Sequence, residues 1–177
     1  MVDVKNLIDI NERKGLPRTY RFRQFLRWFT LFWGVAAIVY AVYLIFDKID
    51  GDTSKYLKVI PFIIMFLAAT SIMRNLFSLN TVVFTTSGVK FTFIGKASIY
   101  IPVGTLTKMD LDDGKHKQIK LTFTVDGKEQ TFMMPISFPG MLEIVNSIAE
   151  LNPDVELDEF MTNVIVSEKE KAKHAGK

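Results

Sequence analysis

The chain contains no cysteine among its 177 residues. Disulfide bridges, cysteine-ligated zinc and thiol catalysis are therefore excluded. Histidine is scarce as well, because His116 and His174 are the only two, and both lie in charged or terminal segments. Such positions are typical of solvated side chains rather than metal ligands. We therefore expect no metal site and no cofactor.

The motifs of the common catalytic and nucleotide-binding sites are missing too. The sequence has no Gly-x-Ser-x-Gly, no P-loop, no His-Glu-x-x-His and no Gly-x-Gly-x-x-Gly. One Ser-x-x-Lys match, from Ser87 to Lys90, falls in a predicted strand turn. There the two side chains would not face each other as they do on a helix. No residues are candidates for catalysis, and we expect a protein that is not an enzyme.

Charge is absent from one long stretch of this apolar chain. Of all residues 49% are hydrophobic and 15 are Phe, a high content for a soluble domain. Residues 28–46 read WFTLFWGVAAIVYAVYLIF without a single charged side chain. As a helix they would span about 28 Å, close to the hydrocarbon thickness of a bilayer. This stretch predicts a transmembrane helix.

A second apolar stretch, residues 57–77, predicts a second span. Lys58 and Arg74 lie near its two ends, where their side chains can reach opposite interfaces. Pro61 would fall in the first helical turn, where its missing N–H costs little. A buried or re-entrant helix is the alternative for this stretch. The two stretches together predict a transmembrane helical hairpin over residues 28–79.

Small residues give this hairpin a predicted contact face, because helices in lipid associate where their backbones approach closely. No acidic residue or histidine lies inside either span, so an ion or proton path has no support. The predicted packing residues are Gly34, Ala37 and Ala41 on the first helix and Ala68 and Ser71 on the second.

Basic residues precede the first span. Residues 1–27 carry seven Lys or Arg against three Asp or Glu, a net charge of +4. Arginines interleaved with aromatic rings can bind nucleic acid, but the uncharged span that follows favours a juxtamembrane segment on lipid headgroups. We expect lipid contacts and no nucleic acid. The predicted interface residues are Arg18, Arg21, Arg23, Arg27, Trp28, Trp33 and Arg74.

The same charges predict the orientation. Six Lys or Arg lie within about twenty residues before the first span, whereas the connection between the spans carries equal numbers of Lys and Asp. The positive-inside rule then places the N-terminus in the cytoplasm, and two spans return the chain to that side. We expect a multi-pass protein of the cell membrane with both termini cytoplasmic.

From residue 80 the period of the sequence changes from helical to two. Alternating segments with turn signals between them predict six or seven antiparallel strands, and Asp126-Gly127 marks one hairpin turn. A helix with one apolar stripe follows, with Ser137 as a possible cap, Pro139 in its first turn and Asn152-Pro153 at its end. The predicted fold class is α+β, with a transmembrane hairpin followed by a cytosolic domain over residues 80–152.

The order of elements resembles the bacterial pleckstrin-homology-like membrane proteins. Two spans are followed by VVFTTSGVKFTFIGKASIYIPVGTLTKMDL, with a glycine in the first hairpin and with Ile101, Pro102 and Leu106 in the next strands. The resemblance covers residues 80–151 and implies an antiparallel β-barrel or sandwich closed by the C-terminal helix, in a non-enzymatic envelope protein. Eukaryotic pleckstrin-homology domains bind phosphoinositides through several basic residues near the first hairpin loop. Here Lys90 stands alone, so inositol-lipid recognition is not expected.

Residues 153–177 predict a short helix and a charged tail. An apolar face on that helix would either bind a partner or cover the domain's own sheet, and the sequence leaves both open. The residues of this face are Phe160, Met161, Val164 and Ile165.

These features predict a membrane-anchored, non-enzymatic scaffold or accessory subunit. It would present its cytosolic domain, at the inner membrane face, to another membrane or cytosolic protein or to a second copy of itself. The alternative is a lipid-responsive module that reads anionic headgroups through the basic residues from Arg13 to Arg27 and the loop at Lys115.

Overall fold

The computed structural model describes residues 15–50, 53–114 and 117–164, which form two units. Each unit is compact by itself. The helical unit contains residues 22–50, 53–80 and 93–97, and the sheet unit contains residues 15–21, 81–92, 98–114 and 117–164.

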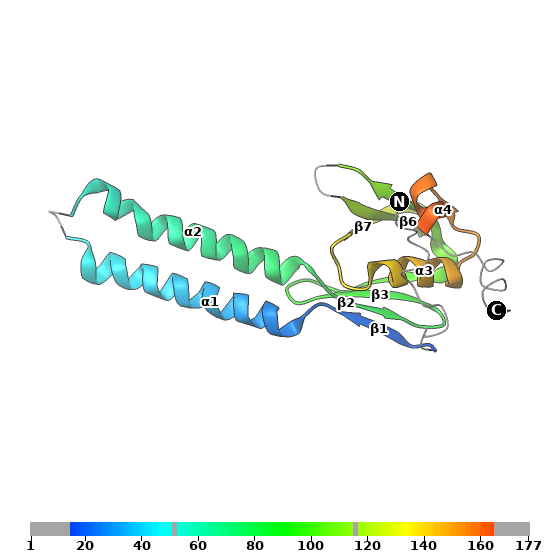
Figure 1. Ribbon diagram of the computed structural model, residues 1–177, viewed down its shortest axis with the longest axis horizontal. Coiled ribbons are helices and arrows are strands. Elements are labelled where there is room, and N and C mark those ends of the chain that lie inside the picture. The colour runs from blue at the N-terminus through cyan, green and yellow to red at the C-terminus, as the bar shows by residue number, and fades with distance from the viewer. Residues whose placement is uncertain (1–14, 51–52, 115–116, 165–177) are drawn as a thin grey trace. The chain divides into compact units, whose positions relative to one another are not determined.

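Two long helices lie side by side in the helical unit (Figure 1). Helix α1 covers Gln24–Tyr43 and continues as the short π-helix η3, Leu44–Lys48, while α2 covers Lys55–Phe77. Both are long and apolar enough to cross a membrane, and only 11% of the most apolar window of each is buried. A core helix of a soluble protein would be mostly buried, so the exposure of these two favours lipid as their surroundings.

Both helices begin earlier than the apolar stretches predict. Helix α1 starts at Gln24 rather than Trp28, because Arg27 is compatible with helix and is accommodated inside it. Helix α2 starts after Ser54, whose hydroxyl accepts a hydrogen bond from the Leu57 amide at 3.5 Å. Pro61 therefore lies inside the helix and not in its first turn.

The sheet unit contains two four-stranded sheets, with strand orders β1-β2-β3-β4 and β7-β6-β5-β8. The pairs β1·β2, β3·β4, β5·β6 and β6·β7 are antiparallel, and β8 runs parallel to β5. The strands are β1 Arg18–Arg21, β2 Leu79–Phe84, β3 Gly88–Phe93, β4 Ile99–Pro102, β5 Leu106–Asp112, β6 Gln118–Val125, β7 Lys128–Pro135 and β8 Glu156–Leu157, with the 3-10 turn η4, Val103–Thr105, between β4 and β5.

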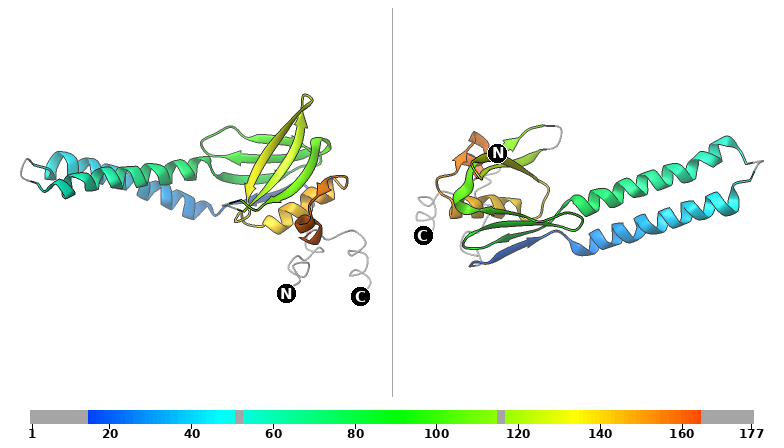
Figure 2. Two further views of the ribbon diagram at one scale, coloured as in Figure 1. Left: turned by 90° about the horizontal axis from the view of Figure 1, so that it is seen from above. Right: turned by 180° about the vertical axis from the view of Figure 1, so that it is seen from behind.

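Figure 2 shows the strands of one sheet crossing those of the other. The two sheets keep separate strand orders and are not closed into a barrel. The α+β class, with two apolar helices followed by antiparallel and mixed sheets, is confirmed. The closed barrel is not confirmed.

Alternation along the sequence located β2 to β7 but not β1 or β8. Strand β1 reads RTYR, in which Arg18 and Tyr20 are half-buried and their neighbours are exposed. Because arginine occupies an inward position, this strand carries no apolar and polar alternation to detect. Strand β8 has only two residues, too few for a period.

The core of the sheet unit lies between its sheets and two helices, α3, Met141–Leu151, and α4, Glu159–Val164. The rings of Phe91 and Phe132 join the two sheets, with their centroids 4.4 Å apart. The apolar stripe predicted on α3 is buried against this core. Fully buried side chains come from all of these elements: Phe84, Phe91, Met109, Leu121, Met134, Ile144, Ile148 and Met161.

Helix α3 begins at Met141, after a glycine in the left-handed conformation. Gly140 has φ +72°, and a Cβ added there would lie 2.9 Å from Cδ1 of Tyr20. Neither Ser137 nor Pro139, which the sequence placed at the start of this helix, belongs to it. The turn at Gly140 sets the start of α3 instead, because only glycine enters it without strain.

We expect Gly140→Ala to destabilise the protein by about 2 kcal/mol, since an L-residue at positive φ costs roughly 1–2 kcal/mol and Tyr20 must also move. Gly104→Ala is the matched control, because nothing lies within 4 Å of a Cβ there. Thermal unfolding of the full chain in detergent measures both. Equal losses of Tm would contradict the role assigned to Gly140.

Candidate functional site

Helices α1 and α2 face each other along a row of small residues. Gly34 and Ala41 on α1 and Ala68 on α2 are buried. With Arg27, the two buried positions of α1 follow a seven-residue spacing, which is typical of helices packed along a seam. A Cβ added at Gly34 would lie 2.7 Å from Cγ1 of Ile72 and 3.7 Å from the carbonyl oxygen of Ala68. The two backbones approach closely here because α1 has no side chain at this position.

The other predicted packing residues lie at the margin of this seam. Ala37 and Ser71 are both half-buried. Gly34, Ala41 and Ala68 therefore form its centre.

Gly34→Leu is expected to destabilise the hairpin by about 1–3 kcal/mol, as overpacking of a closed interior does. The new side chain would have to displace Ile72 and separate the helices. Val35→Leu is the control, because Val35 is 55% exposed. Thermal stability in detergent should differ between the two variants. Similar losses at both positions would show that the small residues do not mark the interface.

Large apolar side chains cover the outward surfaces of the two helices. Trp28 is 63% exposed and Trp33 55%, so both predicted interface tryptophans point away from the protein. A contiguous apolar surface of this extent marks a membrane or interaction surface. Further exposed side chains are Phe25, Phe29 and Phe32 on α1 and Ile63, Phe66 and Leu67 on α2.

Arg27 is the one charged residue among the described part of the chain that is buried, with 2% exposure. Its guanidinium donates to Oδ1 of Asn80 at 2.8 Å, to the carbonyl oxygen of Leu79 at 3.1 Å, and to the carbonyl and hydroxyl oxygens of Ser78. The ring of Phe22 lies 5.2 Å from Cζ, within the range of a cation–π interaction. We call Arg27, Phe22, Ser78, Leu79 and Asn80 the Arg27 cluster.

The Arg27 cluster joins the start of α1 to the residues that follow α2. The acceptors of these hydrogen bonds are neutral oxygens, and among the described residues Nε of Arg27 has no hydrogen-bond partner. A buried cation is costly unless its hydrogen bonds are satisfied, so these contacts decide whether Arg27 is tolerated. The sequence placed Arg27 among headgroup contacts, but its burial leaves little surface for a lipid.

Sequence reasoning missed Ser78 and Asn80 as partners of Arg27. The available signal was a pair of polar residues directly after an apolar span, opposite an arginine directly before the other span. Two antiparallel helices bring such positions to the same end.

Arg27→Met is expected to lower the free energy of unfolding by about 3 kcal/mol, because it removes the charge-assisted hydrogen bonds to Ser78, Leu79 and Asn80. Arg23→Met is the control, since Arg23 is exposed at the N-cap of α1. Its loss should stay within about 0.5 kcal/mol. Thermal unfolding in detergent compares the two variants. A loss no larger for Arg27→Met than for Arg23→Met would refute the structural role of the cluster.

The other predicted interface arginines differ in their surroundings. Arg18 lies in β1 and forms an ion pair with Glu150 at 2.8 Å, which raises the pKa of its guanidinium through the hydrogen bond. It also donates to the hydroxyl of Ser147 at 3.1 Å. Arg21 and Arg74 are exposed, as is Arg23. Arg18 thus ties β1 to α3, while the exposed arginines are accessible to a ligand.

The predicted partner-binding face near the C-terminus is mostly turned inward. Met161 is fully buried and Val164 is 4% exposed, whereas Phe160 is 43% exposed. Asp158 fixes the start of α4, because its carboxylate accepts from the amides of Leu111 at 2.6 Å and Met161 at 2.7 Å. Ile165 lies outside the described residues. The short helix therefore covers the core of its own unit and presents Phe160.

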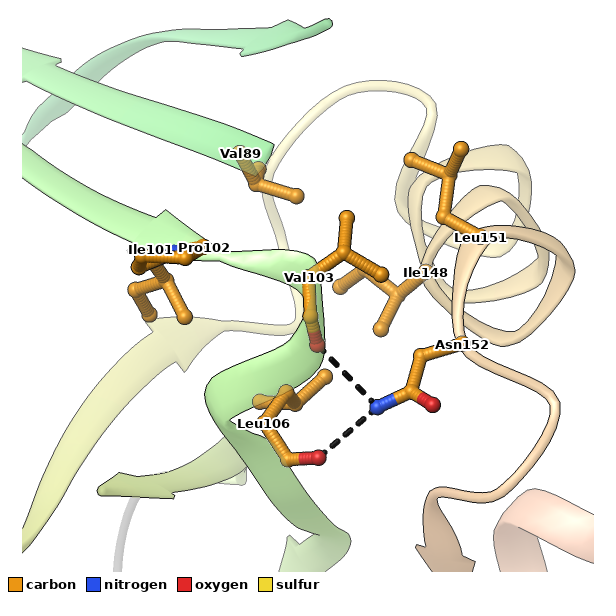
Figure 3. A pocket seen from close by; sticks show the side chains of 8 residues that line it. All are labelled: Val89, Ile101, Pro102, Val103, Leu106, Ile148, Leu151 and Asn152. Atoms are coloured by element: carbon orange, nitrogen blue, oxygen red, sulfur yellow. Dashed lines mark hydrogen bonds between the residues drawn. The ribbon is translucent and has the colours of Figure 1, made fainter. Parts of the chain in front are cut away.

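A small cavity of the sheet unit lies at the C-terminal end of α3 (Figure 3). Its volume is about 10 Å³, room for a single water molecule. Asn152, the C-cap of α3, donates to the carbonyl oxygens of Val103 at 3.2 Å and Leu106 at 2.8 Å beside it. The cavity is too small for an organic ligand. Among the described residues no group of three His, Asp or Glu could hold a metal ion.

Comparison with known proteins finds no relative, since no family model, curated protein or solved structure matches this chain.

Proposed function

We propose that the chain is a membrane-anchored, non-enzymatic scaffold or accessory subunit of a bacterial cell membrane. The observation that carries this proposal is the pair of long apolar helices with outward-facing aromatic and aliphatic side chains. The sheet unit, with a filled core and a cavity for one water molecule, is suited to binding at its surface rather than to enclosing a substrate.

We further propose a pleckstrin-homology-like sandwich for the sheet unit. Two features support this finer assignment: strands β2 to β7 follow one another along the chain, and α3 buries an apolar stripe after them. The separate sheets fit a sandwich better than a barrel.

The orientation we propose places both termini in the cytoplasm. Its support is the charge at the two ends of the helical unit. Arg23 and Arg74 are exposed at the end that holds the Arg27 cluster, while at the other end Asp47 pairs with Lys48 at 3.0 Å. An excess of basic residues on one side is typical of the cytoplasmic side.

Single cysteines test this orientation, because the chain has none of its own. Ser54→Cys precedes α2 and Thr131→Cys lies on β7, and both positions are exposed. In intact cells an impermeant maleimide should label position 54 and leave position 131 unlabelled until the cells are opened. Labelling of both positions in intact cells would refute the proposed topology.

The partner of the scaffold would be another membrane or cytosolic protein, or a second copy of the chain. We expect Phe160 to contribute to this contact, because it is an exposed aromatic beside an otherwise buried face. Phe160→Ala should lower recovery of the partner about tenfold in affinity purification from mild detergent. Met133→Ala, at a residue of similar exposure, is the control. Recovery of the chain alone, as a monomer, would contradict the scaffold.

A lipid-responsive module is the second candidate. The observation in its favour is the uncompensated positive charge at one end of the helical unit, where no acidic side chain occurs in residues 22–46 or 53–80. The loop at Lys115 and His116 lies outside the described residues, and beside it Lys117 pairs with Asp113 at 3.7 Å. In this second candidate function, anionic headgroups would therefore bind the basic residues of the helical unit.

A further inference from the structure

The loop between β3 and β4 belongs to the helical unit, although both strands extend into a sheet. Residues 93–97 group with the helices. The amide of Gly95 donates to the carbonyl oxygen of Leu76 in the last turn of α2 at 2.9 Å. A Cβ added at Gly95 would lie 3.0 Å from Cβ of Leu76. The loop is thus seated against the end of α2 by a backbone contact that a side chain at residue 95 would disturb.

This loop places a basic and an apolar side chain beside the end of α2. The ammonium of Lys96 lies 3.9 Å from the ring centroid of Phe93, so the ring holds the charge near the helix. Ile94 is 38% exposed, and Phe77, the last residue of α2, is 42% exposed. Two exposed apolar side chains thus lie within three residues, along the sequence, of the cations Lys96 and Arg74.

Charge at this end of the helical unit has a single sign. Arg23, Arg74 and Lys96 are exposed there, and Arg27 is buried in the cluster described above. The acidic residues of residues 22–80 all lie in the connection between the helices, at positions 47, 50 and 52. A cationic surface with no acidic residue of its own unit at this end attracts anions.

We propose that Lys96, Arg74 and Arg23 form a binding surface for the headgroups of anionic phospholipids, with Ile94 and Phe77 inserted in the interfacial layer. The occupant is lipid because Phe77 continues the exposed apolar surface of α2, which includes Met73 and Phe66. Headgroup phosphates lie where such a surface leaves the hydrocarbon. The inference rests on the membrane insertion proposed above. It adds to that proposal the class of lipid that binds and the β3–β4 loop as part of the binding surface.

A polarity-sensitive fluorophore on Ile94→Cys tests insertion of the loop. The full chain is placed in nanodiscs of phosphatidylcholine with increasing phosphatidylglycerol. We expect the emission to shift to the blue as the anionic lipid increases and to return at about 0.5 M salt, where charges are screened within about 4–5 Å. The same fluorophore on Thr131→Cys, in β7, should not respond. Emission from position 94 that is independent of phosphatidylglycerol would overturn the proposal.

Charge variants identify the residues involved. Lys96→Gln and Arg74→Gln should each raise the phosphatidylglycerol content needed for the half-maximal shift about fivefold, the equivalent of about 1 kcal/mol per basic residue at an anionic surface. Lys90→Gln, at an exposed lysine of β3 in the sheet unit, is the matched control. An equal effect of Lys90→Gln would assign the response to net charge and overturn the site.

Gly95→Val separates the position of the loop from its charge. The variant keeps Lys96 but places methyl groups against Leu76. We expect it to raise the phosphatidylglycerol content at the half-maximal shift about as much as Lys96→Gln does. An unchanged phosphatidylglycerol content at half-maximal shift would overturn the docked loop as part of the site.

A DNA oligomer tests whether the surface selects lipid. It is added to the labelled chain in nanodiscs of pure phosphatidylcholine, and we expect no blue shift from position 94. A shift as large as that with phosphatidylglycerol would assign the surface to polyanions in general and overturn the choice of lipid.

Failure of this inference can be distinguished from failure of membrane insertion. Maleimide labelling at Ser54→Cys in cells reports the span independently of the headgroup. Correct labelling with no response at position 94 overturns the lipid surface alone. Labelling that shows no span overturns both.

Discussion

The hydrogen bonds of one buried guanidinium join the first turn of α1 to the residues that follow α2, at one end of the helical hairpin. Arg27 lies in the first turn of α1, next to apolar side chains. The oxygens of Ser78, Leu79 and Asn80 accept hydrogen bonds from its guanidinium. Five donors in a rigid fork suit several carbonyl and amide oxygens at once, which a lysine ammonium on a flexible stem does not. The small residues of the seam let the helices approach, but they would allow sliding. Arg27 sets the register, because its partners occur at one position along α2 and its continuation.

The end of α2 needs hydrogen-bond donors, since the last four carbonyl groups of any helix lack an intrahelical donor. In α2 the amide of Ser78 donates to the carbonyl oxygen of Arg74 at 3.1 Å, and the amide of Gly95 donates to that of Leu76 at 2.9 Å. Arg27 donates to the carbonyl oxygens of Ser78 and Leu79, which directly follow the helix. Cations near a helix C-terminus also interact favourably with its dipole. The β3–β4 loop, which supplies the Gly95 donor, also carries Lys96 and so adds positive charge at this end of α2.

Hydropathy and alternation located the elements in which apolar side chains recur at a regular spacing. They failed where an element depends on contacts between residues far apart in the sequence. Strands β2 to β7 and the stripe of α3 follow a period of two or a helical period, so they were predictable. Strand β1 was not, because Arg18 takes an inward position only through its pairing with Glu150, which lies far along the sequence. The start of α3 at Gly140 depends on Tyr20, which is equally distant. The sequence pattern also could not distinguish Arg27, which is buried, from Arg23 and Arg74, which are exposed.

Half-buried polar side chains of the sheet unit and exposed side chains of the helical unit serve different purposes. In the sheet unit three half-buried polar side chains serve the fold: Asn152 closes the turn after β4, Asp158 starts α4, and Arg18 joins β1 to α3. The helical unit exposes aromatic and aliphatic side chains along α1 and α2, and cations at one end. Among the described residues, the surface of the helical unit thus combines apolar side chains that suit the hydrocarbon of a bilayer with cations that suit its headgroup region.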